Sequence, residues 1–348
     1  MHMADALISP AVGGVMWVTT AGIISYSAKK VRTELDESKI PLMGVLGAFI
    51  FAAQMINFTI PGTGSSGHLG GALILSVLLG PYAAFLTMAS ILIVQALFFA
   101  DGGLLALGCN IFNMGFFACF IGYPLIYKRL AGEQPSQARL FGSLSLAAII
   151  SLQLGALGVV LETLASGISE LPFSTFLLLM QPIHLAIGVV EGLITAAVVW
   201  FVWKEAPAIL KTAAARQPLG AIPVKRVLAG LLAVALITAG GLSWFASANP
   251  DGLEWSIAKT TGEEELAATD DGIHGVIAQW QEKIAFLPDY NFKKSEQPAA
   301  AEANEAETSA WPAVDSGTSV AGIIGSIFTL LLAYGVGKGL QSLTTQQS

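Results

Sequence analysis

The stretch LFGSLSLAAIISLQLGALGVVL, residues 140–161, runs without a charged side chain. A second run, FLLLMQPIHLAIGVVEGLITAAVVWF at 176–201, contains one Glu. A transmembrane α-helix needs about 20 predominantly apolar residues, and both runs are longer. The whole chain is 54% hydrophobic and 12% charged, whereas a soluble domain carries about 25% charged residues. We therefore expect an all-α, polytopic transmembrane helical bundle in a lipid bilayer, not a soluble domain with a large apolar core.

Hydropathy along the chain predicts seven core spans and two further spans of an accessory unit. They lie at about 10–28, 41–58, 69–79, 82–99, 104–127, 140–163, 174–203, 227–246 and 320–341. The third segment is short, because Gly80-Pro81 ends it: Pro lacks a backbone donor and disfavours helical geometry in the preceding residue. Irregular backbone at membrane depth is tolerated where it lines a cavity. The 69–79 segment is therefore predicted to form part of the wall of a binding site.

The basic residues predict the orientation, because Lys and Arg concentrate in cytoplasmic loops. With the N-terminus outside and the C-terminus inside, thirteen of the 17 Lys and Arg residues fall on the cytoplasmic side. The short external loops 59–68, 100–103 and 164–173 contain none. We expect a multi-pass protein of the cell inner (plasma) membrane with both Met1 and the 59–68 loop on the external face.

Met1-His2 forms a potential chelate at the start of the chain. The bulky second residue is expected to block removal of Met1, and the flank and cleavage site of a signal peptide are absent. The Met1 amine, the His2 amide nitrogen and His2 Nδ1 can then close two fused rings around one ion and leave a fourth in-plane position open. Tetragonal nitrogen coordination suits Ni(II), Cu(II) and low-spin Co(II). The pair by itself is weak evidence, since any chain can begin Met-His.

A candidate for the fourth ligand is His68, at the end of the loop Pro61-Gly-Thr-Gly-Ser-Ser-Gly-His68. Glycines allow the loop to approach another backbone closely. The predicted topology puts this loop on the same face as Met1. The hypothesis is a metal site of four nitrogens from Met1, His2 and His68. The alternative is a loop histidine that only hydrogen-bonds to backbone.

Several polar side chains near the external ends of spans are candidates for orienting these ligands through hydrogen bonds. They are Gln54, Ser66, Gln95, Asp101, Asn110 and Asn113. Structural hydrogen bonding between helices is an equally good explanation of them. His184 and Glu191, two turns apart, suggest a proton relay, although helix packing is the better interpretation. His274 has no neighbours with metal-ligating side chains and is read as a surface histidine.

Residues 247–319 form a polar segment with 14 Asp and Glu residues against four Lys. Such an external segment either attracts divalent cations or is simply a solvated surface, and the second interpretation is favoured. Two parts of it are expected to be ordered, Pro250-Asp-Gly-Leu-Glu-Trp255 and Phe286-Leu-Pro-Asp-Tyr-Asn-Phe292. The stretch 296–308, rich in Ala and Glu, reads as a flexible linker.

Motifs of several other protein classes are absent from the sequence. It contains no GxxxxGK[ST] phosphate loop, HExxH zinc signature or nucleophile elbow, so neither ATP hydrolysis, enzymatic activity nor a catalytic cofactor is predicted. It has no basic tract for nucleic acid. Cys109 and Cys119 share a span and are not expected to pair. A membrane metalloenzyme would need an acid or base near the metal, for which only Asp5 and Asp101 qualify. An energy-independent divalent cation channel would need a continuous polar lining, which the apolar spans lack.

These residues together resemble the CbiM/NikM family, the substrate-binding membrane components of energy-coupling factor (ECF) transporters for cobalt and nickel. The resemblance covers residues 1 to about 205. It rests on Met1-His2, Ser9-Pro10, Gly62-Thr-Gly-Ser-Ser-Gly-His68-Leu-Gly-Gly71, Leu79-Gly-Pro81, Gln95-Ala-Leu-Phe-Phe-Ala-Asp101-Gly-Gly103, Asn110, Asn113-Met114 and Glu191-Gly-Leu-Ile-Thr195. Pro250-Asp-Gly-Leu-Glu254 is similar to the PDGLE, or NikN/CbiN-like, small subunit, fused here to the first unit.

The resemblance implies near-planar coordination of transported Ni2+ or Co2+ by the Met1 amine, the His2 amide and imidazole, and His68. It also implies a transmembrane coupling (T) subunit and cytoplasmic ATPase subunits as partners. The expected units are a metal-binding membrane domain at 1–205, a cytoplasmic linker at 206–226 and a PDGLE domain at 227–348 with the external loop 247–319. The sequence departs from the family at Met3-Ala4-Asp5-Ala6-Leu7, where members often read Ile-Pro-Asp/Glu-Gly, and its Gly-rich loop is one residue longer. The PDGLE fusion favours nickel by family association alone.

Overall fold

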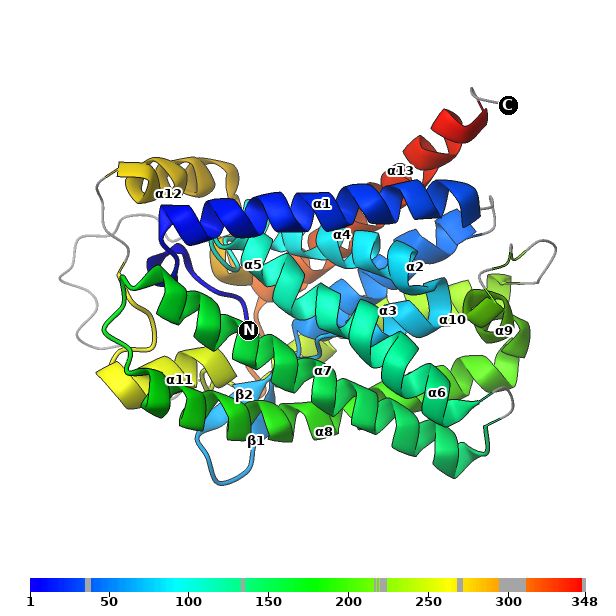
Figure 1. The fold of residues 1–348 in the computed structure, drawn as a ribbon, viewed down its shortest axis with the longest axis horizontal. Coiled ribbons are helices and arrows are strands. Elements are labelled where there is room, and N and C mark those ends of the chain that lie inside the picture. The colour runs from blue at the N-terminus through cyan, green and yellow to red at the C-terminus, as the bar shows by residue number, and fades with distance from the viewer. Residues whose placement is uncertain are drawn as a thin grey trace.

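The computed structural model of the protein describes residues 1–34, 39–132, 135–215, 217, 219, 224–267, 272–293 and 311–345. Long helices run side by side along the longest axis of the molecule (Figure 1). The predicted flexible linker 296–308 lies outside the described residues.

The first unit begins with a short 3-10 turn, η1 (Asp5–Leu7), and continues through helices joined mostly by short loops. These are α1 (Pro10–Glu34), α2 (Lys39–Gln54), α3 (Ala72–Leu79), α4 (Pro81–Phe99), α7 (Gln137–Ser166), α8 (Phe173–Glu205) and α9 (Pro207–Ala215). Between α4 and α7, a single rod is built from α5 (Leu107–Ile111), the π-helical η2 (Phe112–Tyr127) and α6 (Lys128–Ala131). The strands β1 (Phe58–Ile60) and β2 (Ser65–Gly67) form a small hairpin between α2 and α3.

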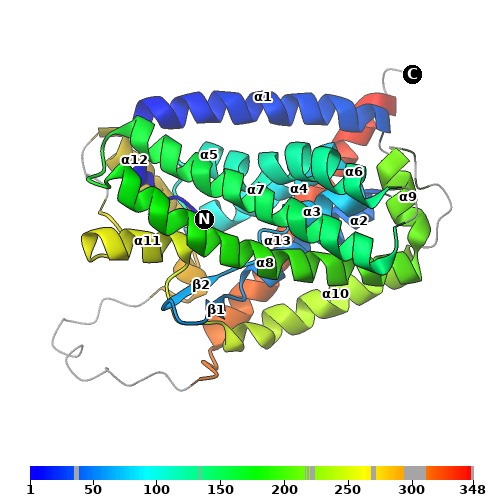
Figure 2. The same cartoon turned by 60° about the horizontal axis from the view of Figure 1, so that its bottom comes forward.

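The second unit contains α10 (Lys225–Gly240), α11 (Gly252–Thr261), α12 (Gly272–Ile284) and α13 (Ser316–Thr345), with 3-10 turns η3 (Leu242–Phe245) and η4 (Pro288–Tyr290). Both α10 and α13 pack against α2 and against each other. The short helices α11 and α12 lie at one end of the bundle (Figure 2). The second unit therefore packs along the first through α10 and α13, and its short helices cover the end of the bundle where Met1 lies.

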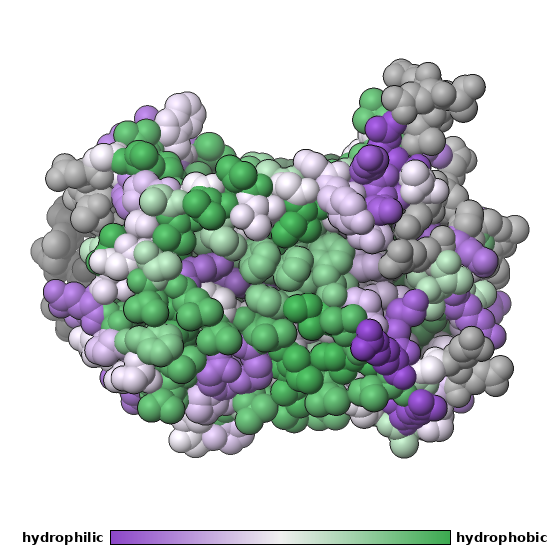
Figure 3. Space-filling model, viewed as in Figure 1, coloured by the Kyte–Doolittle hydropathy of each residue, from purple (hydrophilic) through white to green (hydrophobic). Residues whose placement is uncertain are grey.

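Within the described residues, six helical segments are long and apolar enough to cross a membrane. They are 10–33 in α1, α4, the rod Leu107–Ala131, α7, α8 and 316–343 in α13. Each of the nine predicted spans coincides with a helix, although α2 and α10 have only 16 residues each and α3 has eight. A broad apolar surface covers the side of the bundle (Figure 3), as expected where lipid replaces water. The predicted membrane helical bundle is confirmed.

The short helix α3 lies inside the protein, because all eight of its residues are buried. Its end is set by Gly80, whose φ of 84° is accessible mainly to glycine, followed by Pro81 at the first turn of α4. A helix of eight residues is too short to cross the bilayer by itself. Gly70, just before α3, lines a small cavity together with Met1 and His68, but no residue of 69–79 lines the cavity that contains His2, so the role of this segment in the wall of a site stays a prediction.

The β1–β2 hairpin was not predicted from the sequence. Phe58 pairs with Gly67, and the turn contains Gly62 and Gly64 at φ of 77° and 75°. A Cβ at Gly67 would lie 2.5 Å from the Ile187 side chain on α8, so the hairpin needs glycine for this close approach. The hairpin delivers His68 directly after β2, at the entrance to α3.

Candidate metal centre

The N-terminal segment is fixed by its third residue. The Met3 amide donates to Asn110 Oδ1 at 2.8 Å, and Asn110 Nδ2 donates to the Met3 carbonyl oxygen at 3.1 Å. The Gly103 amide donates to the same carbonyl at 2.9 Å. Because Met3 is fully buried, the two residues before it have little freedom and project into the space in front of His68.

The structure brings the predicted ligands together. The Met1 nitrogen lies 3.4 Å from His68 Nε2. The imidazoles of His2 and His68 stack with their centroids 5.1 Å apart and their planes inclined by 19°. Adjacent nitrogens of a square-planar site with metal–nitrogen bonds of about 2.0 Å lie about 2.8 Å apart. The Met1–His68 pair is thus close to the spacing of two neighbouring ligands.

Hydrogen bonds hold both imidazoles with one ring nitrogen available. His68 Nδ1 donates to the Leu69 carbonyl at 3.2 Å, which leaves the lone pair of Nε2 facing Met1. His2 Nε2 donates to Gln95 Oε1 at 3.2 Å, which leaves Nδ1, the nitrogen that the chelate requires. The partner of one ring nitrogen sets which nitrogen is left for a metal.

Gln95 and Gln54 extend this contact to the glycine-rich loop. Gln95 Nε2 donates to Gln54 Oε1 at 2.8 Å, and Gln54 Nε2 donates to the Gly70 carbonyl at 2.9 Å. The first bond fixes the Gln95 amide so that its oxygen faces His2. The hydrogen-bonded chain therefore runs from His2 to the residue two positions beyond His68 and couples the positions of the two imidazoles.

Burial keeps both histidines neutral. It lowers the pKa of His2 and of His68 from 6.5 to about 3 in each case, and the positive charge of the Met1 ammonium lowers both pKa values further. Desolvation has this direction because it disfavours the charged imidazolium. At neutral pH both rings therefore keep the lone pairs that metal binding requires.

Asp251 of the second unit provides the negative charge that faces the Met1 amine. Its Oδ2 lies 2.9 Å from the Met1 nitrogen and 3.8 Å from His68 Nε2. Oδ1 accepts from the amides of Leu253 and Glu254 at 2.7 and 3.0 Å and so caps α11. Burial acts to raise the pKa of Asp251, but the Met1 ammonium and His68 outweigh it and hold the pKa below its usual range. Asp251 is therefore an anion placed beside two predicted ligands.

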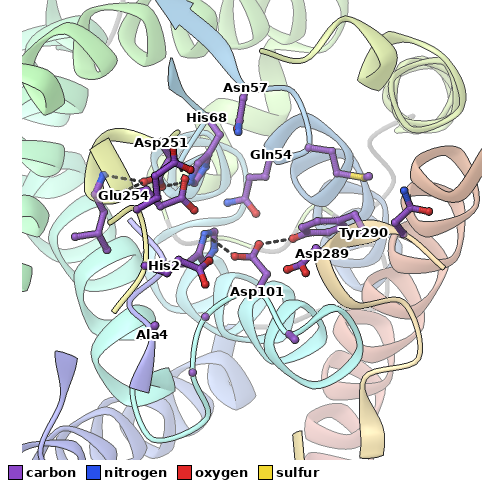
Figure 4. Close-up of a pocket in the computed structure, with 18 of the residues that line it drawn as sticks. His2, Ala4, Gln54, Asn57, His68, Asp101, Asp251, Glu254, Asp289 and Tyr290 are labelled. Atoms are coloured by element: carbon purple, nitrogen blue, oxygen red, sulfur yellow. Dashed lines mark hydrogen bonds and ion pairs between the residues drawn. The ribbon is translucent and has the colours of Figure 1, made fainter. Parts of the chain in front are cut away.

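Asp101 lies on the other side of the site. Its Oδ1 is 3.3 Å from His2 Nδ1, and its Oδ2 accepts a hydrogen bond from the Tyr290 hydroxyl (Figure 4). Burial raises the pKa of the Asp101 carboxyl. The Tyr290 ring stacks on Phe99 with a centroid distance of 5.0 Å. Tyr290 in the second unit thus positions the carboxyl group that faces the chelating nitrogen of His2.

The remaining predicted residues lie farther from the nitrogens. Asn113 Nδ2 donates to Glu162 at 2.6 Å and lies 3.9 Å from the Met3 sulfur. The Ser66 hydroxyl donates to the Asn249 carbonyl at 2.7 Å, so it ties the hairpin to the second unit and does not contact a ligand. Of the six predicted orienting residues, Gln95 and Asp101 contact a ligand side chain, Gln54 acts through Gln95, and Asn110 acts through Met3.

The interpretation of His274 as a surface histidine was wrong. Its side chain is buried, and Nε2 donates to the Ile8 carbonyl at 2.8 Å. The neighbouring Ile273 and Val276 are apolar but exposed, so the burial of His274 follows from the docking of α12 against the N-terminal segment.

Glu191 and His184 each have a local partner. Glu191 accepts hydrogen bonds from the amides of Gly70 and Gly71 at 2.9 and 3.0 Å, and His184 Nδ1 donates to the Met180 carbonyl at 2.8 Å. These contacts agree with a packing role, the better of the two interpretations. Through Gly70 and Gly71, Glu191 also fixes the turn that follows His68.

Sequence reasoning did not identify Asp251, Glu254 or Tyr290 as residues of the site. The available signal was the Pro250–Glu254 motif, whose order was predicted without its partner. All three line a cavity of about 740 Å³ between the two units, together with His2 and His68 (Figure 4). No three His, Cys, Asp or Glu side chains of the described chain are grouped to hold a metal; the predicted site takes two of its four nitrogens from the N-terminal backbone.

Comparison with known proteins identifies the family of each unit. Residues 2–209 match the family described as "Cobalt uptake substrate-specific transmembrane region". The chain belongs to this family. Residues 225–342 match the PDGLE domain, so this family member has the second unit that the Pro250–Glu254 motif indicated.

Relatives with and without the second unit are similar to the chain. A chain of Archaeoglobus fulgidus that bears the name NikMN is 30% identical over 96% of this chain and 97% of its own length. The fused nickel transport protein NikMN of Rhodobacter capsulatus is 30% identical over 79% and 81%. The cobalt transport protein CbiM of Sorangium cellulosum is 30% identical over 60% of this chain and 94% of its own.

A crystal structure described as a transition metal transporter is 31% identical to the chain. It superposes with a TM-score of 0.52 and covers 59% of this chain and 93% of its own length. The relatives are named as transport proteins, and this family member is a transport component and not an enzyme. The metalloenzyme alternative is therefore not retained.

Proposed function

We propose that the protein is the substrate-binding component of an ECF-type ABC transporter and imports Ni2+ or Co2+. The ion is captured on the external side by the Met1 amine, the ionised His2 amide, His2 Nδ1 and His68 Nε2. The observation that carries this proposal is the distance of 3.4 Å between the Met1 nitrogen and His68 Nε2, with both imidazoles held neutral. A planar set of four nitrogens favours both metals.

The proposed topology places the N-terminus outside the plasma membrane and the C-terminus in the cytoplasm. In this arrangement the metal-binding unit is 1–205, the cytoplasmic linker is 206–226, and the PDGLE unit is 227–348. The basic cytoplasmic loops support this orientation. A phosphate-binding loop is absent from the sequence, so energy would come from separate cytoplasmic ATPase subunits through a transmembrane coupling subunit.

A variant with one residue added before Met1 tests the chelate. The extension converts the terminal amine into an amide and should abolish Ni(II) binding in isothermal titration. An equal extension after Ser348 is the matched control and should bind as the unmodified protein does. Mass spectrometry of the purified chain must show an unmodified Met1. Unchanged affinity of the N-terminally extended variant would refute the proposed ligand set.

One uptake experiment separates the proposed transporter from an energy-independent channel. Cells that express the chain alone are compared with cells that also express the coupling and ATPase subunits. Uptake of radioactive nickel or cobalt that requires those subunits supports the ECF proposal, whereas equal uptake without them supports a channel. The same measurement with each metal decides which one is preferred.

A further inference from the structure

Helix α12 carries a stripe of large apolar side chains that the protein does not cover. Ile273, Val276, Trp280 and Ile284 are 53%, 57%, 61% and 37% exposed. At 3.6 residues per turn, these four positions fall within an arc of about 80° on the helix. Such a continuous stripe differs from the single exposed apolar residues that are normal on any surface.

A different side of α12 fixes the helix to the first unit. His274 donates to the Ile8 carbonyl at 2.8 Å. Gln281 Nε2 donates to the carbonyl of Ala96 near the end of α4 at 3.0 Å and to that of Gly102 at 2.8 Å. The apolar stripe is therefore not the face that holds α12 on the protein.

The polar residues of α12 occupy a third side. Gln279, Glu282 and Lys283 are all exposed and lie about 60° to 160° around the helix axis from Trp280, on the side away from His274. An amphipathic helix at a membrane surface has this division, with an apolar side toward the acyl chains and a polar side toward water.

The position of α12 matches the edge of the membrane. Its anchor on Ile8 is two residues before α1 begins at Pro10, and α12 lies beside that end of α1 (Figure 1). The outward side of α1 exposes Val15 and Val18 at 64% and 76%, as expected for a lipid-facing helix. The α12 stripe thus lies near the end of a helix with a lipid-facing side, and Trp280 has the amphipathic ring that is enriched at the membrane–water interface.

We propose that α12 is an interfacial helix whose stripe Ile273, Val276, Trp280 and Ile284 inserts into the lipid surface on the side of Met1. The helix then links the bilayer to the Ile8 carbonyl and restrains the segment that leads back to Met1 and His2. This inference does not depend on which ion the protein binds.

Lipid contact can be measured with a fluorophore on either of two adjacent side chains. Trp280→Cys and Gln279→Cys are each labelled with an environment-sensitive dye in nanodiscs; Cys109 and Cys119 are fully buried and should not compete. Spin-labelled lipids should quench the dye at position 280 several-fold more than the dye at 279, and aqueous iodide should do the reverse. Size-exclusion profiles show whether both variants remain folded.

Equal quenching of both positions by iodide would overturn the proposal. Protection of position 280 only after the coupling and ATPase subunits are added would also overturn it, because the stripe would then be a protein interface. A third variant, Val276→Cys, lies on the stripe one turn away and should be quenched as position 280 is.

Discussion

Asp251→Asn is the substitution whose effect on metal affinity has the least obvious sign. Asn keeps the side-chain oxygen that accepts from the Leu253 and Glu254 amides, so the cap of α11 is preserved. The change replaces the carboxylate oxygen 2.9 Å from the Met1 nitrogen with a neutral NH2 group, so the negative charge beside the ammonium is lost. It therefore separates two roles of the carboxylate: attraction of an incoming cation, and stabilisation of the metal-free ammonium.

Distances decide which role is larger. The carboxylate attracts the ammonium at 2.9 Å by about 5.7 kcal/mol at an effective dielectric constant of about 20. A bound divalent ion with an ionised His2 amide carries a net charge of +1. It would lie up to about 4.9 Å from the carboxylate if the metal–nitrogen bond is about 2.0 Å, which gives about 3.4 kcal/mol. The metal-free state gains more from Asp251 by at most about 2.3 kcal/mol, so Asp251→Asn should bind Ni(II) more tightly, by up to roughly 40-fold.

Isothermal titration with Ni(II) at pH 7 measures this difference directly, with competition against a chelator if binding is too tight. Glu254→Gln is the matched control, because it removes another carboxylate from the same helix cap. The Glu254 carboxylate accepts a hydrogen bond from the Asp251 amide at 2.8 Å. The affinity of Glu254→Gln should change less than that of Asp251→Asn. Unchanged or weaker binding by Asp251→Asn would refute the reasoning and would mean that the carboxylate chiefly attracts or holds the ion.

Two further predictions concern the loop and the imidazoles. Glu191→Ala should weaken Ni(II) binding by about 10- to 100-fold in the same titration. The substitution leaves the amides of Gly70 and Gly71 without their acceptor and so loosens the turn after His68. Retained affinity would show that this turn is fixed without Glu191. Acid should destabilise the metal-free protein. The pKa values of His2 and His68 are about 3 in the folded protein, whereas the ordinary value of 6.5 applies to the unfolded chain. Their contribution to the free energy of unfolding is therefore complete above pH 6.5 and is lost as the pH falls toward 3. The melting temperature measured at pH 7, 5 and 4 should show this decrease, and in His68→Gln it should fall less steeply with pH. An equally steep fall in the variant and the unmodified protein would contradict the role of His68.

The helical bundle could be predicted because a bilayer imposes a requirement on composition and length. Each predicted span therefore coincides with a helix, even where the helix has only eight residues. Boundaries were less accurate: the second span was predicted to reach residue 58, but α2 ends at Gln54. The residues after it, up to Asn57, lead into a hairpin of two three-residue strands. Strands of that length leave no periodic signal, and Gly62 and Gly64 indicated only freedom of the backbone.

The chelating residues could be proposed from local chemistry, because Met1 and His2 are adjacent and His68 follows a distinctive loop. Their charged neighbour could not, since 250 positions separate Met1 from Asp251. The Asp251 side chain has a sufficient local role as the cap of α11, and nothing in the motif indicates that its second oxygen faces an ammonium. His274 illustrates the same limit, because its burial is created by a docking contact with Ile8.

The two units contribute differently to the candidate site. The predicted ligand nitrogens come from Met1, His2 and His68, and the contacts that orient the two imidazoles also lie in the first unit. The second unit contributes Asp251 beside the Met1 nitrogen and Tyr290 on the carboxyl that faces His2. Because an ion bound between these nitrogens would replace the ammonium as the positive partner of Asp251, occupation of the site would change the contact at the start of α11. The PDGLE unit is therefore placed to respond to the ion directly, without a conformational change relayed through the bundle.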